Sequence, residues 1–226
     1  MSMSSLGRLA ALASAMTLAA TVLSSCGSAS PGVAAQVGDD TITTSQVDEL
    51  AADVCTLQKA LPKGGPNEQQ PTSGLVARDG ALQSLILRSI GEQMAADHGV
   101  SADSDYEAQV HQTRLQFGTV DEETVEAALP AYTSVAYFVN IMRQIGKSTG
   151  ASNDDEALTA GIKQAQSWQS DHPIETNPMF GSFSIGDQEI ESERDDLAFP
   201  VSKTAKDAES GSADYYASLP ESQRCG

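Results

Sequence analysis

Apolar residues recur every three or four positions through most of the chain, and this spacing limits its fold more than any other feature. One stripe ends before Pro62 and consists of Val47, Leu50, Val54, Leu57 and Leu61. Such a spacing places the side chains on one face of an α-helix. The same pattern predicts five further helices, over Gly74–His98, Ser101–Phe117, Asp121–Leu129, Tyr132–Lys147 and Asn153–Trp168. We expect Pro130 to end the fourth helix, and the whole fold to be mainly α-helical.

A short strand hairpin is predicted before the first helix. Two β-prone runs, Ala35–Val37 and Thr41–Ile42, flank the turn signal Gly38–Asp40. The hydroxyl residues Thr43, Thr44 and Ser45 follow, and each can cap the N-terminus of a helix. Asp48 stands three residues after Ser45 in the manner of a capping box.

The charge of the chain excludes one class of partner. Basic residues number 13 and acidic residues 31, which gives a formal net charge of −18. Binding to nucleic acid needs clustered Lys and Arg, so no nucleic-acid partner is expected. Anionic lipid head groups would also repel the protein surface. The acidity fits a protein that must stay soluble on a crowded cell surface.

The first 26 residues have the pattern of an export signal. Arg8 is the only charge before Cys26, and about fifteen small or apolar residues run from Leu9 to Leu23. Leu23-Ser24-Ser25-Cys26 resembles a bacterial lipobox. The resemblance implies cleavage before Cys26, a lipid on its sulfur, and an extracytoplasmic protein held on the bacterial cell membrane by that lipid. The alternative is an ordinary secretory signal with Cys26 as an incidental thiol.

This interpretation divides the chain into four parts. Residues 1–25 would be the signal peptide, 26–34 a flexible tether of small residues, 35–183 the helical domain and 184–226 an acidic C-terminal segment. If Cys26 carries lipid, Cys55 and Cys225 remain as one pair in an oxidising compartment. We expect them to form a disulfide that pins the C-terminal segment back on the domain. Two free thiols are the alternative.

No residue pattern points to catalysis. His98, His111 and His172 are scattered, and none has metal-ligand spacing to another His or Cys. The two serines between Gly181 and Gly186 do not have the spacing of a nucleophile elbow, and no glycine-rich phosphate loop occurs in the sequence. We therefore expect a protein that is not an enzyme and that binds no metal and no cofactor.

Two motifs resemble the N-terminal domain of the SurA-like, PrsA-related extracytoplasmic chaperones. The first is the opening Val37–Asp48, a strand and turn that lead into a helix at Ile-Thr. The second is Asn177–Phe183, which in that family usually reads Asn-Pro-Arg-Tyr-Gly and an aromatic residue. The matching residues are Asn177, Pro178, Gly181 and Phe183, whereas Met179 and Phe180 replace the Arg and Tyr. The match covers residues 35–183.

The resemblance implies a helical domain that holds unfolded or secreted polypeptides without ATP. Many members also carry a prolyl isomerase module of about a hundred residues, but only 43 residues follow Phe183 here, so isomerase activity is not expected. The residues expected to contact a polypeptide lie in the most apolar stretch and are Tyr132, Tyr137, Phe138 and Met142. The alternative is that this stripe is simply buried core.

Two other functions fit the same sequence. One is an adaptor or structural lipoprotein of the envelope with a single dedicated partner. The other is a ligand-binding lipoprotein that serves a transporter, although such proteins usually alternate strands and helices and are longer than the 201 residues that follow residue 25.

Overall fold

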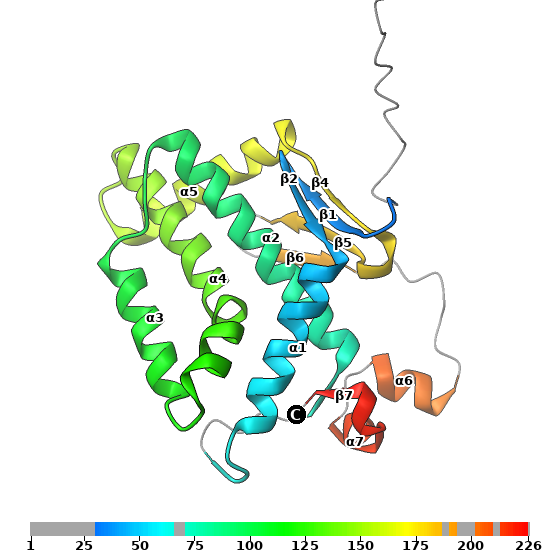
Figure 1. Ribbon diagram of the computed structural model, residues 1–226. Helices are drawn as coiled ribbons and strands as arrows, with labels where there is room; N and C mark the ends of the chain where they lie inside the picture. Colours follow the sequence, from blue (N-terminus) through cyan, green and yellow to red (C-terminus); the bar gives the residue numbers. More distant parts are fainter. Residues whose placement is uncertain (1–29, 66–70, 187–189, 194–201, 210–212, 226) are drawn as a thin grey trace, which may run out of the picture.

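The protein is a mainly helical body with a short strand hairpin at its N-terminal end, as the sequence predicts (Figure 1). The structure, a computed structural model, describes residues 30–65, 71–186, 190–193, 202–209 and 213–225. The helices are α1 (Thr44–Ala60), α2 (Gly74–His98), α3 (Ser104–Gln116), α4 (Glu122–Ser148), α5 (Asp154–Asp171), α6 (Lys203–Glu209) and α7 (Ala213–Ser218). The predicted signal peptide and the predicted lipidation site Cys26 lie outside the described residues.

In the part of the chain that the structure describes, the strands form three small antiparallel sheets. They are β1 (Val33–Val37), β2 (Asp40–Thr43), β3 (Thr72–Ser73), β4 (Ile174–Thr176), β5 (Ser182–Ile185), β6 (Ile190–Glu193) and β7 (Arg224–Cys225). The predicted hairpin is β1 and β2, and β4 adds to its other edge in the order β2-β1-β4. Ala35 pairs with Thr176, so the start and the end of the predicted domain lie side by side.

Two expected boundaries are corrected by these strands. The tether was expected to run to residue 34, but β1 begins at Val33, and Ala34 is fully buried in the core. The domain was expected to end at Phe183, but this residue lies inside β5, which continues to Ile185 and pairs with β6.

The N-cap of α1 is one of the three predicted candidates, but the capping box differs from the expected pair of Ser45 and Asp48. Thr43, and not Ser45, is the N-cap: its hydroxyl accepts a hydrogen bond from the Gln46 amide, and the Gln46 side chain accepts one from the Thr43 amide. Thr43 is the last extended residue of β2, whereas Ser45 already lies within the helix. Asp48 pairs instead with Arg78 of α2 at 2.6 Å.

α4 is one continuous helix, so the prediction of two helices separated at Pro130 is wrong. Proline removes one backbone hydrogen bond from a helix interior. Burial of the residues on both sides of Pro130 compensates for this lost hydrogen bond, since Leu129 and Thr133 are only 7% and 4% exposed. The hydroxyls of Thr133 and Ser134 donate to the carbonyls of Leu129 and Pro130.

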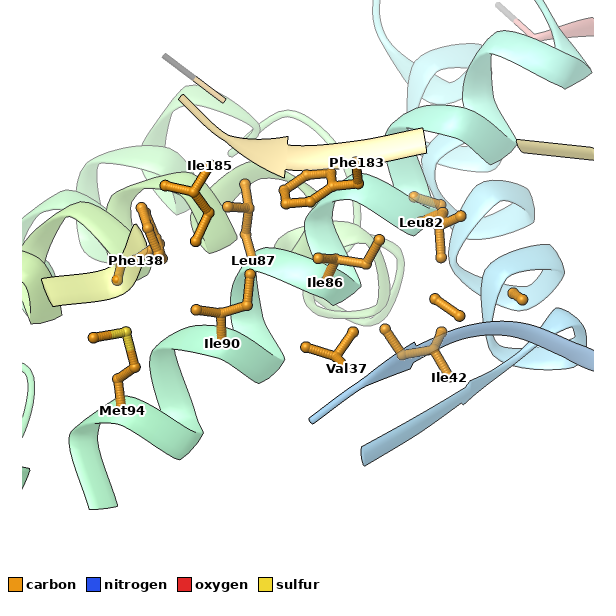
Figure 2. Packing of buried hydrophobic residues seen from close by; sticks show 14 of the residues in the cluster. Val37, Ile42, Leu82, Ile86, Leu87, Ile90, Met94, Phe138, Phe183 and Ile185 are labelled. Atoms are coloured by element: carbon orange, nitrogen blue, oxygen red, sulfur yellow. The ribbon is translucent and has the colours of Figure 1, made fainter. Parts of the chain in front are cut away.

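The main core forms around α2. Figure 2 shows the α2 side chains Leu82, Ile86, Leu87, Ile90 and Met94 between Val37 and Ile42 of the N-terminal sheet and Phe183 and Ile185 of β5. Phe138 of α4 belongs to the same cluster. A second, smaller cluster lies between α1 and α4 and consists of Leu57, Leu61, Phe117, Val125 and Ala128.

α4 and α5 approach each other so closely that both need glycine at the crossing. A Cβ built on Gly146 would lie 1.9 Å from the carbonyl oxygen of Ala157, and one built on Gly161 would lie 2.0 Å from that of Met142. The missing side chains therefore let the two helix backbones touch.

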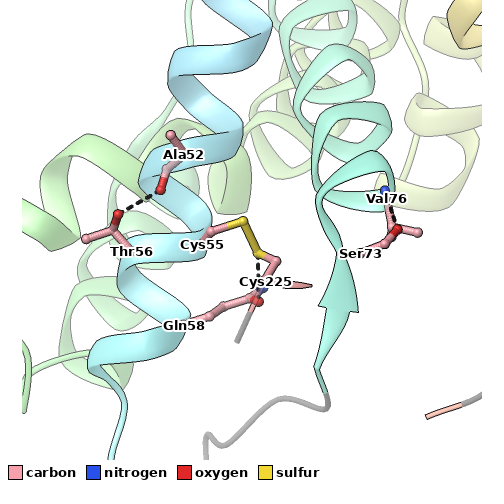
Figure 3. Close-up of a disulfide and its surroundings, with 7 residues drawn as sticks. All are labelled: Ala52, Cys55, Thr56, Gln58, Ser73, Val76 and Cys225. Carbon is pink, nitrogen blue, oxygen red and sulfur yellow. Dashed lines mark hydrogen bonds between the residues drawn. A yellow bond between two sulfur atoms is a disulfide. The ribbon is translucent and has the colours of Figure 1, made fainter. Parts of the chain in front are cut away.

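The C-terminal segment packs back on the body as expected from the cysteines. Cys225 forms a disulfide with Cys55 of α1, with Cα atoms 4.7 Å apart (Figure 3). The adjacent β7 pairs with β3 through Thr72 and Ser73, and Cys225 and Tyr216 are buried. The disulfide thus connects the end of the chain to the first helix.

Candidate functional site

A groove of about 520 Å³ lies between α3 and the helices α2 and α4. In Figure 1, α3 stands at the outer edge of the helical body beside α4. α3 contributes Tyr106, Glu107, Val110 and Arg114 to the groove, α4 contributes Glu126, Leu129, Pro130 and Thr133, and α2 contributes Arg88. Its volume lies in the range of pockets that bind ligands.

α3 is fixed at its N-terminal end by Asp103. This carboxylate caps the helix by accepting from the Asp105 amide at 3.0 Å, and it also accepts from the side chains of Asn140 at 2.6 Å and Gln144 at 2.5 Å. The hydrogen bond from Asn140 is the main reason that the pKa of Asp103 is lowered from its ordinary value of 3.8. The network joins the start of α3 to α4.

α3 is fixed at its other end by Phe117 and Arg114. Phe117 is 1% exposed and packs against Tyr132 with ring centroids 4.9 Å apart. Arg114 forms a two-point ion pair with Glu126, at 2.5 and 3.0 Å, which holds the pKa of Glu126 below its ordinary value. None of the residues of α3, all of which the structure describes, is buried. The helix is therefore held near its ends, and the side of α3 from Tyr106 to Arg114 lines the groove.

Arg88 forms the α2 wall of the groove, and its charge is fully engaged. Its guanidinium lies 3.9 Å from the centroid of the Tyr137 ring, and it donates to the Tyr106 hydroxyl at 3.2 Å. It also pairs with Glu92 at 2.5 Å. These contacts order the wall without leaving a free cation on it.

The apolar stretch expected to contact a polypeptide is mostly core. Phe138 and Met142 are fully buried in the main cluster, so the prediction of a polypeptide-binding role is wrong for these two. Tyr132 packs against the second cluster. Tyr137 is partly buried, contacts Tyr106 and Arg88, and thus stands next to the groove without lining it. The stripe is buried because α4 packs against α1, α2 and α5.

The family-motif residues also have structural roles. Asn177 donates from its side chain to the Val33 carbonyl at 3.1 Å and from its backbone to that of Ala34 at 2.8 Å. Pro178 begins a short 3₁₀ helix, η1 (Pro178–Phe180), and Gly181 follows it at a φ of 80°. Phe183 then enters the main core at 6% exposure. The motif therefore joins β4 and β5 to the N-terminal sheet.

The groove residues were not predicted as a site. α3 has few apolar residues, namely Tyr106, Ala108, Val110 and Leu115, which is too few for a helix that packs fully on a core. That weak stripe is the one signal in the sequence that α3 stands away from the body. The position of α2 and α4 beneath it depends on tertiary packing.

Other kinds of site are not found in the described residues. In that part of the chain, no group of three or more His, Cys, Asp or Glu residues could hold a metal ion. No helix within the described ranges combines the length and the apolar character needed to cross a membrane.

Comparisons with family models, with curated proteins and with solved structures find no match for this chain. The resemblance to the SurA-like chaperones is therefore carried by the two sequence motifs and stays a prediction.

The Asp103 network makes part of the stability dependent on pH. A carboxyl whose pKa is lower in the folded protein contributes stability above its ordinary pKa of 3.8, and this contribution is lost as the pH falls through the folded value. We expect D103A to lower the free energy of unfolding by about 1 kcal/mol at pH 7, the usual cost of a lost N-cap.

The matched variant is D103N, which keeps a capping oxygen but cannot titrate. Urea unfolding between pH 7 and pH 3 should show a smaller loss of stability for D103N than for the native sequence. Equal losses would contradict the role of the Asp103 carboxylate.

Proposed function

We propose that the mature protein is a lipid-anchored extracytoplasmic protein that holds segments of unfolded or secreted polypeptide without ATP and without catalysis. The observation that carries this proposal is the groove beneath α3. Val110, Leu129 and Pro130 supply the apolar part of its lining, and Glu107, Arg114 and Glu126 supply charged side chains. A polypeptide needs both, because its side chains gain from leaving water while its backbone must keep hydrogen bonds.

The walls of the groove suit repeated, reversible binding. α3 is anchored at both ends by Asp103 and Phe117, so a segment can enter and leave beneath its middle without unfolding the core. The sequence shows no phosphate-binding loop that would couple this binding to nucleotide hydrolysis. Binding energy alone would then hold the segment, and dilution of unfolded chains would release it.

The cysteines support the proposed location. A disulfide such as Cys55–Cys225 forms and persists in oxidising compartments outside the cytoplasm. Lipid on Cys26 would hold the domain at the membrane, where exported chains emerge unfolded. The negative charge of the domain keeps it soluble and directs it away from the anionic lipid surface.

The size of the groove favours a second candidate, an adaptor with one dedicated partner. About 520 Å³ accommodates only a few side chains. The exposed large apolar residues elsewhere, namely Leu75, Val76, Leu115, Val135 and Met179, come from several elements. A single short segment of one dedicated partner would fill a groove of this size, just as a segment of any of many clients would.

The test uses a soluble form that begins after Cys26. An unfolded client protein is diluted from denaturant with and without this form, and light scattering reports its aggregation. We expect suppression well beyond that given by an inert protein of equal negative charge. No suppression at several-fold molar excess would overturn the general holding function and favour the adaptor.

The groove itself is tested with a matched pair of variants. V110D places a charge in the apolar part of the groove lining, and V135D places one on α4 at a valine that is 49% exposed and does not line the groove. We expect V110D to require about tenfold more protein for the same suppression, because its charge must be desolvated by the bound segment. V135D should act like the native sequence. Equal activity of V110D and V135D would place the site elsewhere.

A further inference from the structure

Pro130 leaves the backbone carbonyl of Glu126, a residue that lines the groove, without its helical donor. In a helix, the carbonyl of residue i accepts from the amide of residue i+4. Pro130 has no amide hydrogen, so the Glu126 carbonyl cannot receive this bond. Helical carbonyls point along the axis toward residue i+4, and both Glu126 and Pro130 line the groove. The acceptor without a helical donor therefore belongs to a residue that lines the groove.

Glu107 is the second unused group of the groove. This side chain is exposed, lines the groove from α3, and forms no ion pair with any basic side chain in the described part of the chain. The other ionised groups of the groove are already paired, Arg114 with Glu126 and Arg88 with Glu92. A bound molecule thus meets one unpaired carboxylate and no unpaired cation on these walls.

The Glu126 carbonyl and the Glu107 carboxylate determine which kind of molecule, called the guest here, the groove would bind. A backbone N–H is free in an extended segment but is used internally in a helix, so the Glu126 carbonyl favours an extended guest. The Glu107 carboxylate complements a Lys or Arg side chain. Between them, Val110 and Leu129 favour an apolar side chain.

We propose that the groove binds extended polypeptide segments in which a lysine or arginine adjoins apolar residues. The segment donates a backbone N–H to the Glu126 carbonyl, pairs its cation with Glu107, and places its apolar side chain against Val110. This specificity rests on the proposed holding function and identifies the class of segment that the protein holds.

Two labelled peptides of twelve residues test the charge preference. One has a Leu- and Val-rich centre flanked by lysines, and the other has glutamate in place of each lysine. Fluorescence anisotropy should show that the lysine peptide binds at least about fivefold more tightly in low salt, and that added salt reduces the difference. Equal binding, or tighter binding of the glutamate peptide, would overturn the proposal.

Variants separate recognition in the groove from general attraction to an acidic protein. E107Q should weaken binding of the lysine peptide about threefold and leave the glutamate peptide unaffected or slightly favoured. E175Q, which removes an exposed carboxylate from β4 outside the groove, is the matched control and should leave the preference intact. An equal effect of E107Q and E175Q would overturn the role of Glu107.

P130A tests the backbone acceptor. Alanine supplies the missing amide and closes the helical hydrogen bond of the Glu126 carbonyl, so α4 should become more stable while both peptides bind about threefold more weakly. Unchanged or tighter binding to P130A would overturn the role of this carbonyl.

The peptide-binding assay and the aggregation assay test the segment preference and the holding function separately. If the native protein suppresses client aggregation but does not distinguish the peptides, the segment preference is overturned and the holding function stands. If it neither suppresses aggregation nor binds either peptide, both proposals fail.

Discussion

A protein that carries Gly161→Ala is expected to lose about 3 kcal/mol of unfolding free energy, the upper part of the usual range for overpacked cores. The new Cβ would lie 2.0 Å from the carbonyl oxygen of Met142, and real contacts of this kind do not occur below about 3 Å. The obstacle is backbone on α4 and not the end of a flexible side chain. The helices must therefore separate, which opens the packing around Ala165 and Ile145.

The control for this prediction is Gly80→Ala. Gly80 lies in α2, and a Cβ built there meets no atom within 4 Å. Alanine should raise the unfolding free energy by about 0.5–1 kcal/mol, because it has the better helix propensity. Urea unfolding of both variants checks the pair. A Gly161→Ala protein as stable as the native sequence would contradict the close α4–α5 crossing.

Removing the disulfide with the double variant C55S/C225S is expected to cost about 3 kcal/mol of unfolding free energy. The bridge joins residues 170 positions apart, and for so long a loop the chain-entropy model gives an upper value of about 5 kcal/mol. The strand at the end of this segment is short, since β7 pairs with only the two residues of β3. Without the bridge, this segment should leave the body before the rest unfolds.

Thermal melting with and without dithiothreitol measures this effect. The reductant should lower the melting temperature of the native sequence to that of the double variant and should not change the variant itself. Limited trypsin digestion should then cut first at Lys203, Lys206 or Arg224 in the reduced protein. A melting temperature that is insensitive to dithiothreitol would contradict a stabilising bridge.

Local sequence patterns predicted most of the helices. The apolar stripe of Val47, Leu50 and Leu57 is buried on α1 as expected, and α2 begins and ends at Gly74 and His98 as predicted. The N-terminal hairpin forms around the expected Gly38 turn. These features depend on residues close together in the chain, which is why periodicity and turn residues predict them.

Features that depend on distant residues were missed. Pro130 has the local signal of a helix end, but burial on both sides of it keeps α4 continuous. β4 is only three residues long and owes its existence to pairing with β1, more than a hundred residues earlier. In both cases tertiary packing outweighs local preference.

The candidate site was missed for the same reason. Phe138 and Met142 are apolar, and the sequence does not show whether an apolar stripe faces a core or a guest. The groove lies along α3, which is held near its two ends by contacts that include those of Asp103 and Phe117. The partners that hold it, Asn140 and Tyr132, belong to α4 and are distant in sequence.

The claim that the groove beneath α3 holds polypeptide is tested most directly by photo-crosslinking. The soluble form is made with the photoreactive residue p-benzoylphenylalanine in place of Val110, and in a second protein in place of Val135 as the control. Each is irradiated while an unfolded client is diluted from denaturant, and the adducts are located by mass spectrometry. We predict client adducts at position 110 and few at position 135. Adducts at position 135 with none at position 110 would contradict the claim.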